Sequence, residues 1–387
     1  MHIYFSVGEP SGDLHAARLI GELKRREPTL EFSGFGGPLM EQAGCRLSFR
    51  LTDFAVMGVA DVLPHLWRFH QLRQQARQEL ARRRPDAVVL VDYPGFNWHV
   101  ARAAHELKIP VQYYLPPQLW AWLPGRIKKV KKHVDRVLCC LPFEWDWYRR
   151  QGVSAEYVGH PFFDDVAERR LDSQFVDLWQ AAPRRTVTIL PGSRDKELSR
   201  NWPVMHRVMR SLAARLPDIR FLIGCYKESH RRFIEARLLT DTTPLPAHTF
   251  VGRTSEVIEA ADACLMVSGS VSLEMLARRK PAVVMYRVQR RTYWVGRMLV
   301  KCKYMALPNL MAENAVLPEF LIVGEQPEAS ENIAGSLHTW LTDERAYQTK
   351  LRELDRLCDR VAQPGASARA AELILDARPA RVAKKAA

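Results

Sequence analysis

Short apolar runs alternate with longer amphipathic segments along most of the chain. The runs at residues 2–7, 86–92, 186–190 and 263–267 are rich in β-branched and aromatic residues and contain few polar positions. This composition is typical of strands buried on both faces of a parallel sheet. Between them, segments such as 14–26 space their apolar residues as one face of a helix does. The alternation predicts an α/β fold built on parallel sheets.

The same pattern divides the chain into two series of strands and helices. A polar, acidic stretch near residues 163–170 separates them, and 387 residues are more than one core usually serves. We expect two doubly wound, Rossmann-like domains facing across a cleft, at residues 1–165 and 166–365. Residues 366–387 are expected to hold the end of a helix and a basic, disordered tail.

The composition describes a soluble globular protein, with 47% hydrophobic and 26% charged residues. No run approaches the ~18 apolar residues of a transmembrane helix, and acidic residues interrupt the N-terminus, so we expect no signal peptide. The seven cysteines show no metal-binding spacing and are expected to be buried free thiols in a reducing cytoplasm. The net charge of +14 predicts a polyanionic partner, for which nucleic acid, anionic lipid and a phosphorylated substrate all qualify.

The central stretch TVTILPGSRDKE, residues 186–197, is the first candidate site. A buried strand enters a helix through a tight turn, where free backbone N–H groups and the helix dipole favour an anion. Arg194 adds a planar fork of donors suited to a phosphate. The alternative is an ordinary turn with an exposed arginine. Arg194 is a candidate catalytic residue, and Gly192, Ser193 and Glu197 are candidate substrate-binding residues.

A second turn of the same kind follows the strand at residues 263–267. Ser268, Gly269 and Ser270 lead into a helix whose N–H groups could hold a second phosphate. Glu274, one turn further on, could accept hydrogen bonds from both ribose hydroxyls, or it only caps the helix or forms a salt bridge. The two turns together predict a nucleotide-diphosphate site, to which Asn309 could add a donor. An acidic D-x-D pair is missing from the sequence, so we expect metal-free, cofactor-free catalysis in which positive donors replace the ion.

The N-terminal half offers two further candidate loops. The loop GEPSGD follows the first strand but does not match GxGxxG, so it supports a dinucleotide site poorly. Asp92 ends an apolar strand, where ligands bind in open parallel sheets, although it could instead cap its own loop. We expect Asp13 to cap its own helix and Glu144 to lie at another helix start. The candidate substrate-binding residues of this half are Gly8, Glu9, Ser11, Gly12, Asp13 and Asn97.

An apolar stretch and a basic stretch are candidates for membrane contact. Residues 55–67 contain few charges and place several apolar side chains on one helical face. Residues 126–133 are strongly basic. A core-packed helix and a solvated basic face are the alternatives. The candidate membrane residues are Val59, Val62, Leu63, Leu66, Trp67, Lys128 and Lys129.

Nine motifs in this order carry a resemblance to a known family. They are GEPSGD, AVMGVADVL, VDYPGFN, PPQLWAW, LPFE, VGHP, LPGSR, SGSVSLE and LPNL, between about residues 3 and 325. The chain resembles lipid-A-disaccharide synthase, a family of inverting GT-B glycosyltransferases. It departs from the family's usual PDFN at Pro94–Asn97 and from SPSVWAW at Pro116–Trp122, both in the acceptor half, so acceptor preference follows less directly than the donor.

The resemblance implies a reaction and a place for it. The enzyme would join UDP-2,3-diacylglucosamine to 2,3-diacylglucosamine 1-phosphate (lipid X) through a β-1,6 bond, with release of UDP. Residues 1–165 would face the acceptor and the anionic membrane surface, and residues 166–365 would bind the UDP-sugar. Asp92 would match the family's essential aspartate, Arg194 the arginine of LPGSR, and Glu274 and Asn309 the UDP contacts. The implied location is the cytoplasmic face of the inner membrane, held peripherally.

Two rival functions stay open on the sequence. A non-hydrolysing UDP-GlcNAc 2-epimerase-like enzyme would share the architecture and the UDP site, but its soluble substrate gives no reason for the apolar stretch. A basic nucleic-acid-binding protein would explain the charge, yet no RNP, KH or zinc motif is present. We therefore expect no nucleic-acid partner, and a homodimer stays an open alternative.

Overall fold

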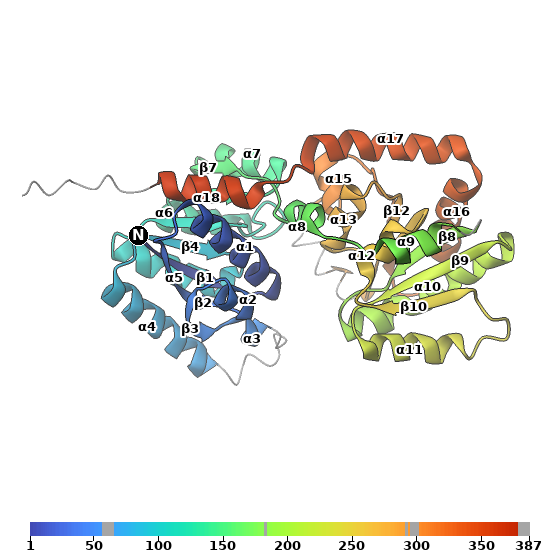
Figure 1. The fold of residues 1–387 in the computed structure, drawn as a ribbon, viewed down its shortest axis with the longest axis horizontal. Coiled ribbons are helices and arrows are strands. Elements are labelled where there is room, and N and C mark those ends of the chain that lie inside the picture. Colours follow the sequence, from blue (N-terminus) through green and yellow to red (C-terminus); the bar gives the residue numbers. More distant parts are fainter. Residues whose placement is uncertain (56–65, 182–183, 291–292, 295–301, 378–387) are drawn as a thin grey trace, which may run out of the picture. The chain divides into compact units, whose positions relative to one another are not determined.

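The computed structural model describes residues 1–387 except 56–65, 182–183, 291–292, 295–301 and 378–387. Its chain divides into two compact units (Figure 1). Unit 1 comprises Met1–Asp164 together with the chain from Pro364 onward, and unit 2 comprises Asp165–Gln363. Each unit is a parallel sheet with helices on both faces, so the predicted fold class of two parallel-sheet α/β domains is confirmed.

Unit 1 contains a parallel sheet with the strand order β3-β2-β1-β4-β5-β6-β7. One face packs on α1 and α18, and the other on α4, α5, α6 and α7, through separate clusters of buried apolar side chains. The strands are β1 (His2–Val7), β2 (Glu31–Gly36), β3 (Arg46–Arg50), β4 (Ala87–Val91), β5 (Val111–Tyr114), β6 (Arg136–Cys139) and β7 (Ala155–Tyr157). The helices are α1 (Pro10–Arg26), α2 (Pro38–Gln42), α3 (Thr52–Ala55), α4 (Leu66–Arg83), α5 (Pro94–Glu106), α6 (Ile127–His133), α7 (Pro142–Arg150) and α18 (Ala366–Asp376), with a 3-10 turn at Pro124–Arg126.

Helix α18 belongs to unit 1 although it comes last in the chain. It lies beside α1 (Figure 1) and buries Ala370, Ala371 and Ile374 against the sheet. The Asp164 carboxylate accepts hydrogen bonds from the backbone N–H groups of residues 365, 366 and 367, at 2.5, 3.2 and 3.0 Å. These bonds satisfy the free donors at the start of the helix. The segment that the sequence set apart at residues 366–387 therefore contributes a packed helix to the first sheet.

Unit 2 contains a parallel sheet with the order β10-β9-β8-β11-β12-β13. Helices α10 and α16 cover one face, and α9 and α12 pack against the other. The strands are β8 (Arg185–Leu190), β9 (Ile219–Cys225), β10 (Ala247–Val251), β11 (Ala263–Val267), β12 (Ala282–Val288) and β13 (Glu319–Val323). The helices are α9 (Ser173–Gln180), α10 (Asp195–Arg215), α11 (Glu228–Leu238), α12 (Thr254–Glu259), α13 (Val271–Ala277), α15 (Leu307–Ala312), α16 (Pro327–Thr342) and α17 (Glu344–Val361), while α8 (Phe162–Glu168) spans the boundary between the units.

Each sheet has one place where the strand order reverses. In unit 1 the reversal lies between β1 and β4, and in unit 2 between β8 and β11. Connections on the two sides of such a point run to opposite faces, so a crevice opens at the carboxyl ends of the two strands, where ligands bind in open α/β sheets. The four loops that follow β1, β4, β8 and β11 therefore mark where the chemistry should be sought.

Candidate active site

The reversal point of unit 2 contains a pocket of about 210 Å³. Its walls come from the ends of β8, β9 and β11 and the loops that follow them. Six of the predicted substrate-binding residues line it: Gly192, Ser193, Glu197, Ser268, Gly269 and Ser270. Tyr226 and Thr254, which were not predicted from the sequence, also line the pocket. Both follow strand ends, and that position could have singled them out.

The two turns of this pocket need small residues for a geometric reason. Gly192 has a φ of +113°, a region that L side chains rarely adopt, and an added Cβ would lie 3.0 Å from Glu197. The Ser268 hydroxyl donates to the carbonyl of Met305 at 3.3 Å, and the Ser272 hydroxyl donates to the carbonyl of Gly269 at 2.7 Å. These two hydrogen bonds fix the second turn, whose Ser268, Gly269 and Ser270 line the pocket.

Arg194 is the N-cap of α10 and stands beside the pocket rather than in its lining. Its side chain is 81% exposed and donates from Nη1 to Glu197 Oε1 at 2.8 Å. Ion pairs this exposed contribute about 0–1 kcal/mol. The guanidinium can therefore leave Glu197 for a better anion at little cost.

Glu274 and Asn309 lie behind the pocket walls and are not among its lining residues. Glu274 is 3% exposed, and its Oε1 accepts from Arg278 Nε at 2.9 Å, while Arg278 Nη1 donates to Glu259 at 2.8 Å. The salt-bridge alternative is thus what the structure contains. The fully buried Asn309 donates to Glu319 and to the carbonyl of Leu317 and accepts from the N–H of Leu317, at 2.6–2.7 Å.

These two residues fix elements that carry the pocket. Glu274 belongs to α13, which begins directly after the Ser268–Ser270 turn. Glu319, the partner of Asn309, also accepts from the N–H groups of Met305 and Ala306 at 2.8 Å. It thereby holds the Met305 carbonyl that receives Ser268. In this structure both side chains position the second turn.

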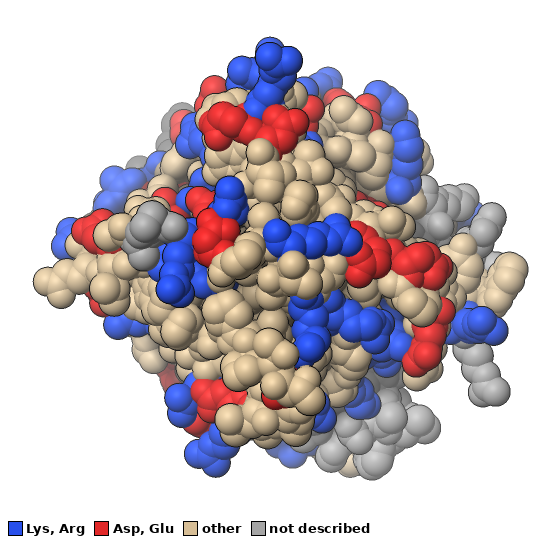
Figure 2. Space-filling view, turned by 90° about the vertical axis from the view of Figure 1, so that its right-hand side faces the viewer, with Lys and Arg blue, Asp and Glu red and all other residues tan. Residues whose placement is uncertain are grey.

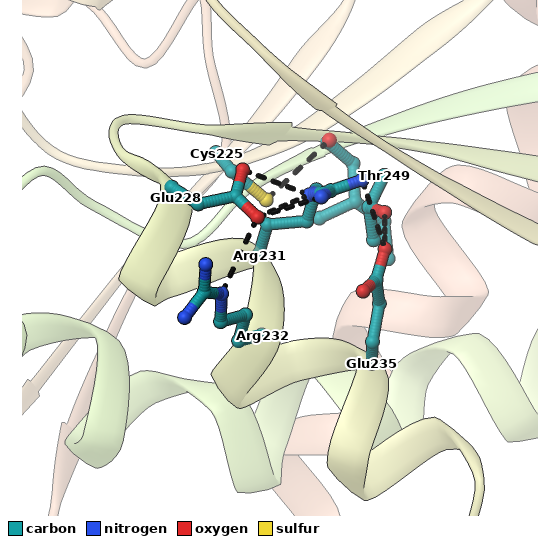
Figure 3. Close-up of polar contacts among 7 residues, drawn as sticks. Cys225, Glu228, Arg231, Arg232, Glu235 and Thr249 are labelled. Carbon is teal, nitrogen blue, oxygen red and sulfur yellow. Dashed lines mark hydrogen bonds and ion pairs between the residues drawn. The ribbon is translucent and has the colours of Figure 1, made fainter.

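Helix α11, which begins two residues after Tyr226, carries a set of exposed ion pairs. Arg231 lies between Glu228, at 2.6 Å, and Glu235, at 3.8 Å (Figure 3). Thr249 of β10 donates to Glu235 at 2.5 Å, so the helix is fastened to the edge strand. Asp195, at the start of α10, pairs with Lys227 and with His230 at 2.8 Å each. Ion pairs this exposed contribute little to stability, and Tyr226, which lines the pocket, is itself 69% exposed.

The reversal point of unit 1 is built around Asp92. Asp92 and Tyr93 have φ values of +44° and +43°, a left-handed conformation that costs roughly 1–2 kcal/mol per residue. The Asp92 carbonyl accepts from Asn97 Nδ2 and from the Tyr113 hydroxyl, both at 2.7 Å. Burial raises the pKa of the Asp92 carboxyl, and a backbone hydrogen bond from Tyr93 opposes the rise. A carboxyl group that has a raised pKa and lies on a strained backbone turn at a strand end is typical of a functional site.

Asn97 holds this turn in place from the protein interior. It is fully buried, and its Nδ2 donates to the carbonyls of Ser6, Val91 and Asp92 at 3.2, 3.2 and 2.7 Å. Its Oδ1 accepts from the Ser6 hydroxyl at 2.6 Å. The amide therefore ties the ends of β1 and β4 together. Asn97, a predicted substrate-binding residue, has the role of a positioning residue in this structure.

The loop GEPSGD faces the Asp92 turn at one end and the interior at the other. A Cβ on Gly8 would lie 2.0 Å from the Tyr93 ring, so only glycine allows this approach. Burial is the main cause that raises the pKa of Tyr93, and the charge of Glu9 adds to it. Glu9 is the N-cap of α1, and Ser11 is exposed. Gly12 is buried, with Val7 at 3.0 Å from the position of a Cβ. Thus Gly8 and Glu9 reach the turn.

The expectation that Asp13 caps its own helix is wrong. The buried carboxylate accepts from the backbone N–H groups of Gly37, Leu39 and Met40 at 3.0–3.1 Å. It therefore caps α2, because α1 lies beside that helix and Asp13 faces its first turn. This partner lies more than 20 residues away in sequence and was not predictable from local spacing.

Known proteins similar to this chain match it over nearly its whole length. The family model described as lipid-A-disaccharide synthetase matches residues 3–373. The chain belongs to the lipid-A-disaccharide synthetase family. The lipid-A-disaccharide synthase of Myxococcus xanthus is 38% identical over 377 residues, covering 96% of both chains. That of Syntrophus aciditrophicus is 35% identical over 370 residues, covering 95% of this chain and 96% of the relative.

Solved structures with this fold are more distant in sequence. The UDP-GlcNAc 2-epimerase from Neisseria meningitidis bound to UDP-GlcNAc has a TM-score of 0.64 at 14% identity and covers 97% of this chain and 100% of that one. A calicheamicin glycosyltransferase has a TM-score of 0.61 at 14% identity, with 97% of each chain covered. At this identity the likeness concerns the fold alone, so it does not favour the epimerase alternative. Membership of the lipid-A-disaccharide synthetase family confirms the predicted class, a glycosyltransferase of lipid A biosynthesis.

The predicted membrane residues of this family member are only partly visible. Val59, Val62 and Leu63 lie outside the described residues, as does the side chain of Leu66, which begins α4. Trp67 is 72% exposed, and Lys128 and Lys129 are exposed on α6. Two further apolar side chains, Trp122 and Leu123, are exposed shortly before that helix.

None of the described helices combines the length and apolar content that crossing a membrane requires. Within the same residues, no three His, Cys, Asp or Glu side chains gather closely enough to hold a metal ion. On the face drawn in Figure 2, basic and acidic side chains are interspersed rather than collected into one basic surface. That distribution does not favour a nucleic-acid partner on this face.

Proposed function

We propose that this family member transfers 2,3-diacylglucosamine from its UDP derivative to lipid X, forming the β-1,6-linked disaccharide 1-phosphate and UDP. The observation that carries the proposal is the coincidence of both candidate sites with the two reversal points. The two turns that suit the phosphates of UDP follow β8 and β11, and Asp92, on its left-handed backbone turn, follows β4.

The donor's UDP is proposed to bind in the pocket of unit 2. Backbone N–H groups of the turns at Gly192–Ser193 and Ser268–Ser270 suit the two phosphates. Arg194 would release Glu197 and approach the β-phosphate as negative charge develops on the leaving UDP. Membership of the lipid-A-disaccharide synthetase family, for which the sequence resemblance implies a UDP-linked donor, supports a uridine diphosphate as the donor group.

Asp92 is proposed as the general base. As the primary hydroxyl of lipid X attacks C1 of the donor, its proton passes to the Asp92 carboxylate, and the electron pair of the C1–O bond leaves with UDP. Attack on the face opposite UDP inverts the anomeric centre. The raised pKa of Asp92 supports this role, since a base works best when its pKa approaches the working pH. Asn97 and Tyr113 would hold the carboxylate by holding its backbone.

Both substrates carry acyl chains, so we propose peripheral binding at the cytoplasmic face of the inner membrane. Trp67, Trp122 and Leu123 would meet the apolar region, and Lys128 and Lys129 would meet anionic headgroups. Each basic group near an anionic surface contributes about 1 kcal/mol and is screened by salt, whereas apolar contact is not. Binding to anionic vesicles should therefore fall only partly at high salt, and complete release at high salt would contradict the apolar contact.

One assay tests the reaction directly. The protein is incubated with UDP-2,3-diacylglucosamine and lipid X, and the products are identified by mass. Disaccharide 1-phosphate with stoichiometric UDP is expected, and a reaction mixture without lipid X serves as the control. Formation of UDP-N-acetylmannosamine from UDP-GlcNAc, without disaccharide, would establish the epimerase instead. Light scattering of the same preparation distinguishes a homodimer from a monomer.

A further inference from the structure

A second buried carboxylate, Glu144, lies at the same edge of unit 1 as Asp92. It stands in the first turn of α7, which begins shortly after β6. Strands β4, β5 and β6 are neighbours, so their carboxyl ends, and the residues that follow them, lie side by side. Glu144 is only 2% exposed, and the charge of Asp92 acts on it. The mechanism above does not use it.

Glu144 holds the segment that follows β5. Its Oε1 accepts from the indole N–H of Trp120 at 3.1 Å, and its Oε2 accepts from the N–H of Cys140 at 3.3 Å. The Trp120 ring also meets Phe143 edge-on, with ring centroids 4.7 Å apart. One turn further along α7, the Tyr148 hydroxyl donates to the carbonyl of Pro117 at 2.8 Å. The helix thus grips residues 115–123 at two points.

This segment begins next to Asp92. The N–H of Asp92 donates to the carbonyl of Leu115 at 3.2 Å, and Leu115 itself has a φ of +52°. Trp120 is half-buried, and Trp122 is 51% exposed. The loop therefore presents aromatic surface at the carboxyl edge that holds Asp92. Aromatic side chains of this kind pack well against the apolar faces of sugar rings.

We propose that Glu144 is a positioning residue for the acceptor: through Trp120 it holds the 115–123 loop beside Asp92. The inference rests on the proposed function, because it assigns Asp92 as the base and the acceptor to unit 1. A loop released from Glu144 would misplace the acceptor hydroxyl relative to Asp92 and leave UDP binding in unit 2 unchanged.

The electrostatics of Glu144 provide an independent readout. Burial raises the pKa of Glu144 to about 8, against the hydrogen bonds from Trp120, Cys140 and Leu141, and the charge of Asp92 raises it further. The other titratable groups that interact with Glu144 are Cys139, Cys140 and Tyr148, whose pKa values burial also raises. The Trp120 N–H should therefore experience a change of charge at its acceptor near pH 8.

The kinetic test compares Glu144→Ala, which removes the acceptor of the Trp120 N–H, and Trp120→Phe with the control Glu156→Ala, which alters an exposed carboxylate on β7 of the same unit. Both test variants should raise the KM for lipid X about fivefold, as loss of an uncharged hydrogen bond of about 1 kcal/mol does. The Kd for UDP, measured by calorimetry, should stay within twofold of wild type. The double variant should raise the KM for lipid X no further than the more severe single variant does, because both changes remove the contact between Glu144 and Trp120.

A spectroscopic test separates this role from simple structural support. The indole ¹⁵N resonance of Trp120, assigned by its absence in Trp120→Phe, should titrate with a midpoint near pH 8 in the wild type and not in Glu144→Gln. If Glu144→Ala does not fold, Trp120→Phe alone carries the kinetic comparison. A wild-type enzyme that makes the disaccharide while both variants keep the wild-type KM for lipid X overturns this inference alone. A wild-type protein that makes no disaccharide overturns the proposed function and this inference with it.

Discussion

Asn97→Asp is the sharpest test of how the Asp92 turn is held. The substitution changes one NH₂ group to oxygen and keeps the shape of the side chain. In the wild type that NH₂ donates to three carbonyl oxygens at 2.7–3.2 Å in a site with no solvent exposure. A carboxylate there would face three acceptors without a proton to offer them.

The magnitude follows from the state that the new carboxyl adopts. Near pH 4 it can stay protonated and keep one donor, so about two hydrogen bonds at about 1 kcal/mol each are lost. Because the folded protein disfavours the charged form, the folded-state pKa is raised above the unfolded value of about 3.9. Such a group loses stability as pH rises from the unfolded pKa toward the folded one. Each pH unit between the two pKa values costs about 1.4 kcal/mol, so the loss should grow by about 4 kcal/mol between pH 4 and pH 7, to about 6 kcal/mol in total, slightly above the cost of an unpaired buried charge.

The assay is urea unfolding at pH 5 and pH 7.5, followed by tryptophan fluorescence. Trp98 lies next to Asn97 in the sequence and packs in the core of unit 1, so the signal includes that unit. Asn332→Asp is the matched control, since Asn332 is an exposed residue of α16. Asn97→Asp should lose clearly more stability at pH 7.5 than at pH 5, whereas the control should change little at either pH. A loss below about 1 kcal/mol that is equal at both pH values would refute the assignment of Asn97 as a buried donor.

Three further substitutions test the proposed site. Asp92→Asn keeps the shape of the base and removes its basicity, so the rate should fall about 10²–10⁴-fold with UDP affinity unchanged; a fall below about tenfold would reduce Asp92 to a residue that only shapes its loop. Arg194→Ala should weaken transition-state stabilisation by about 2–4 kcal/mol, measured as kcat, whereas the control Arg200→Ala, which removes an exposed guanidinium from the same helix, should keep the wild-type rate; unchanged turnover in Arg194→Ala would remove it from the site. Asp13→Ala should lower the free energy of unfolding by about 1–2 kcal/mol through loss of the α2 cap, which is measured as a lower midpoint temperature of thermal unfolding. A midpoint equal to wild type would show that α2 does not depend on this carboxylate.

The sequence by itself was sufficient for the elements and for most of the pocket. Buried strands such as those at residues 186–190 and 263–267 can be predicted from the sequence, because β-branched runs bounded by small residues have few other stable conformations. Since the carboxyl ends of parallel strands share one edge, the turns after these strands had to lie near each other, and six predicted residues line one pocket. The ordered motifs identified the family for the same reason, because they mark these loops.

Tertiary structure decided what the buried polar side chains do. Asp13 caps α2, Glu274 pairs with Arg278, and Asn309 fastens Leu317 and Glu319, although each had been considered for a local cap or a ligand. The start of α18, which packs against the first sheet, is likewise capped by a distant residue, Asp164, about 200 residues earlier in the chain. A strand or a turn is specified by its neighbours in sequence, whereas a buried polar group must bond to whatever donor or acceptor packing brings within about 3 Å. That partner depends on the whole fold.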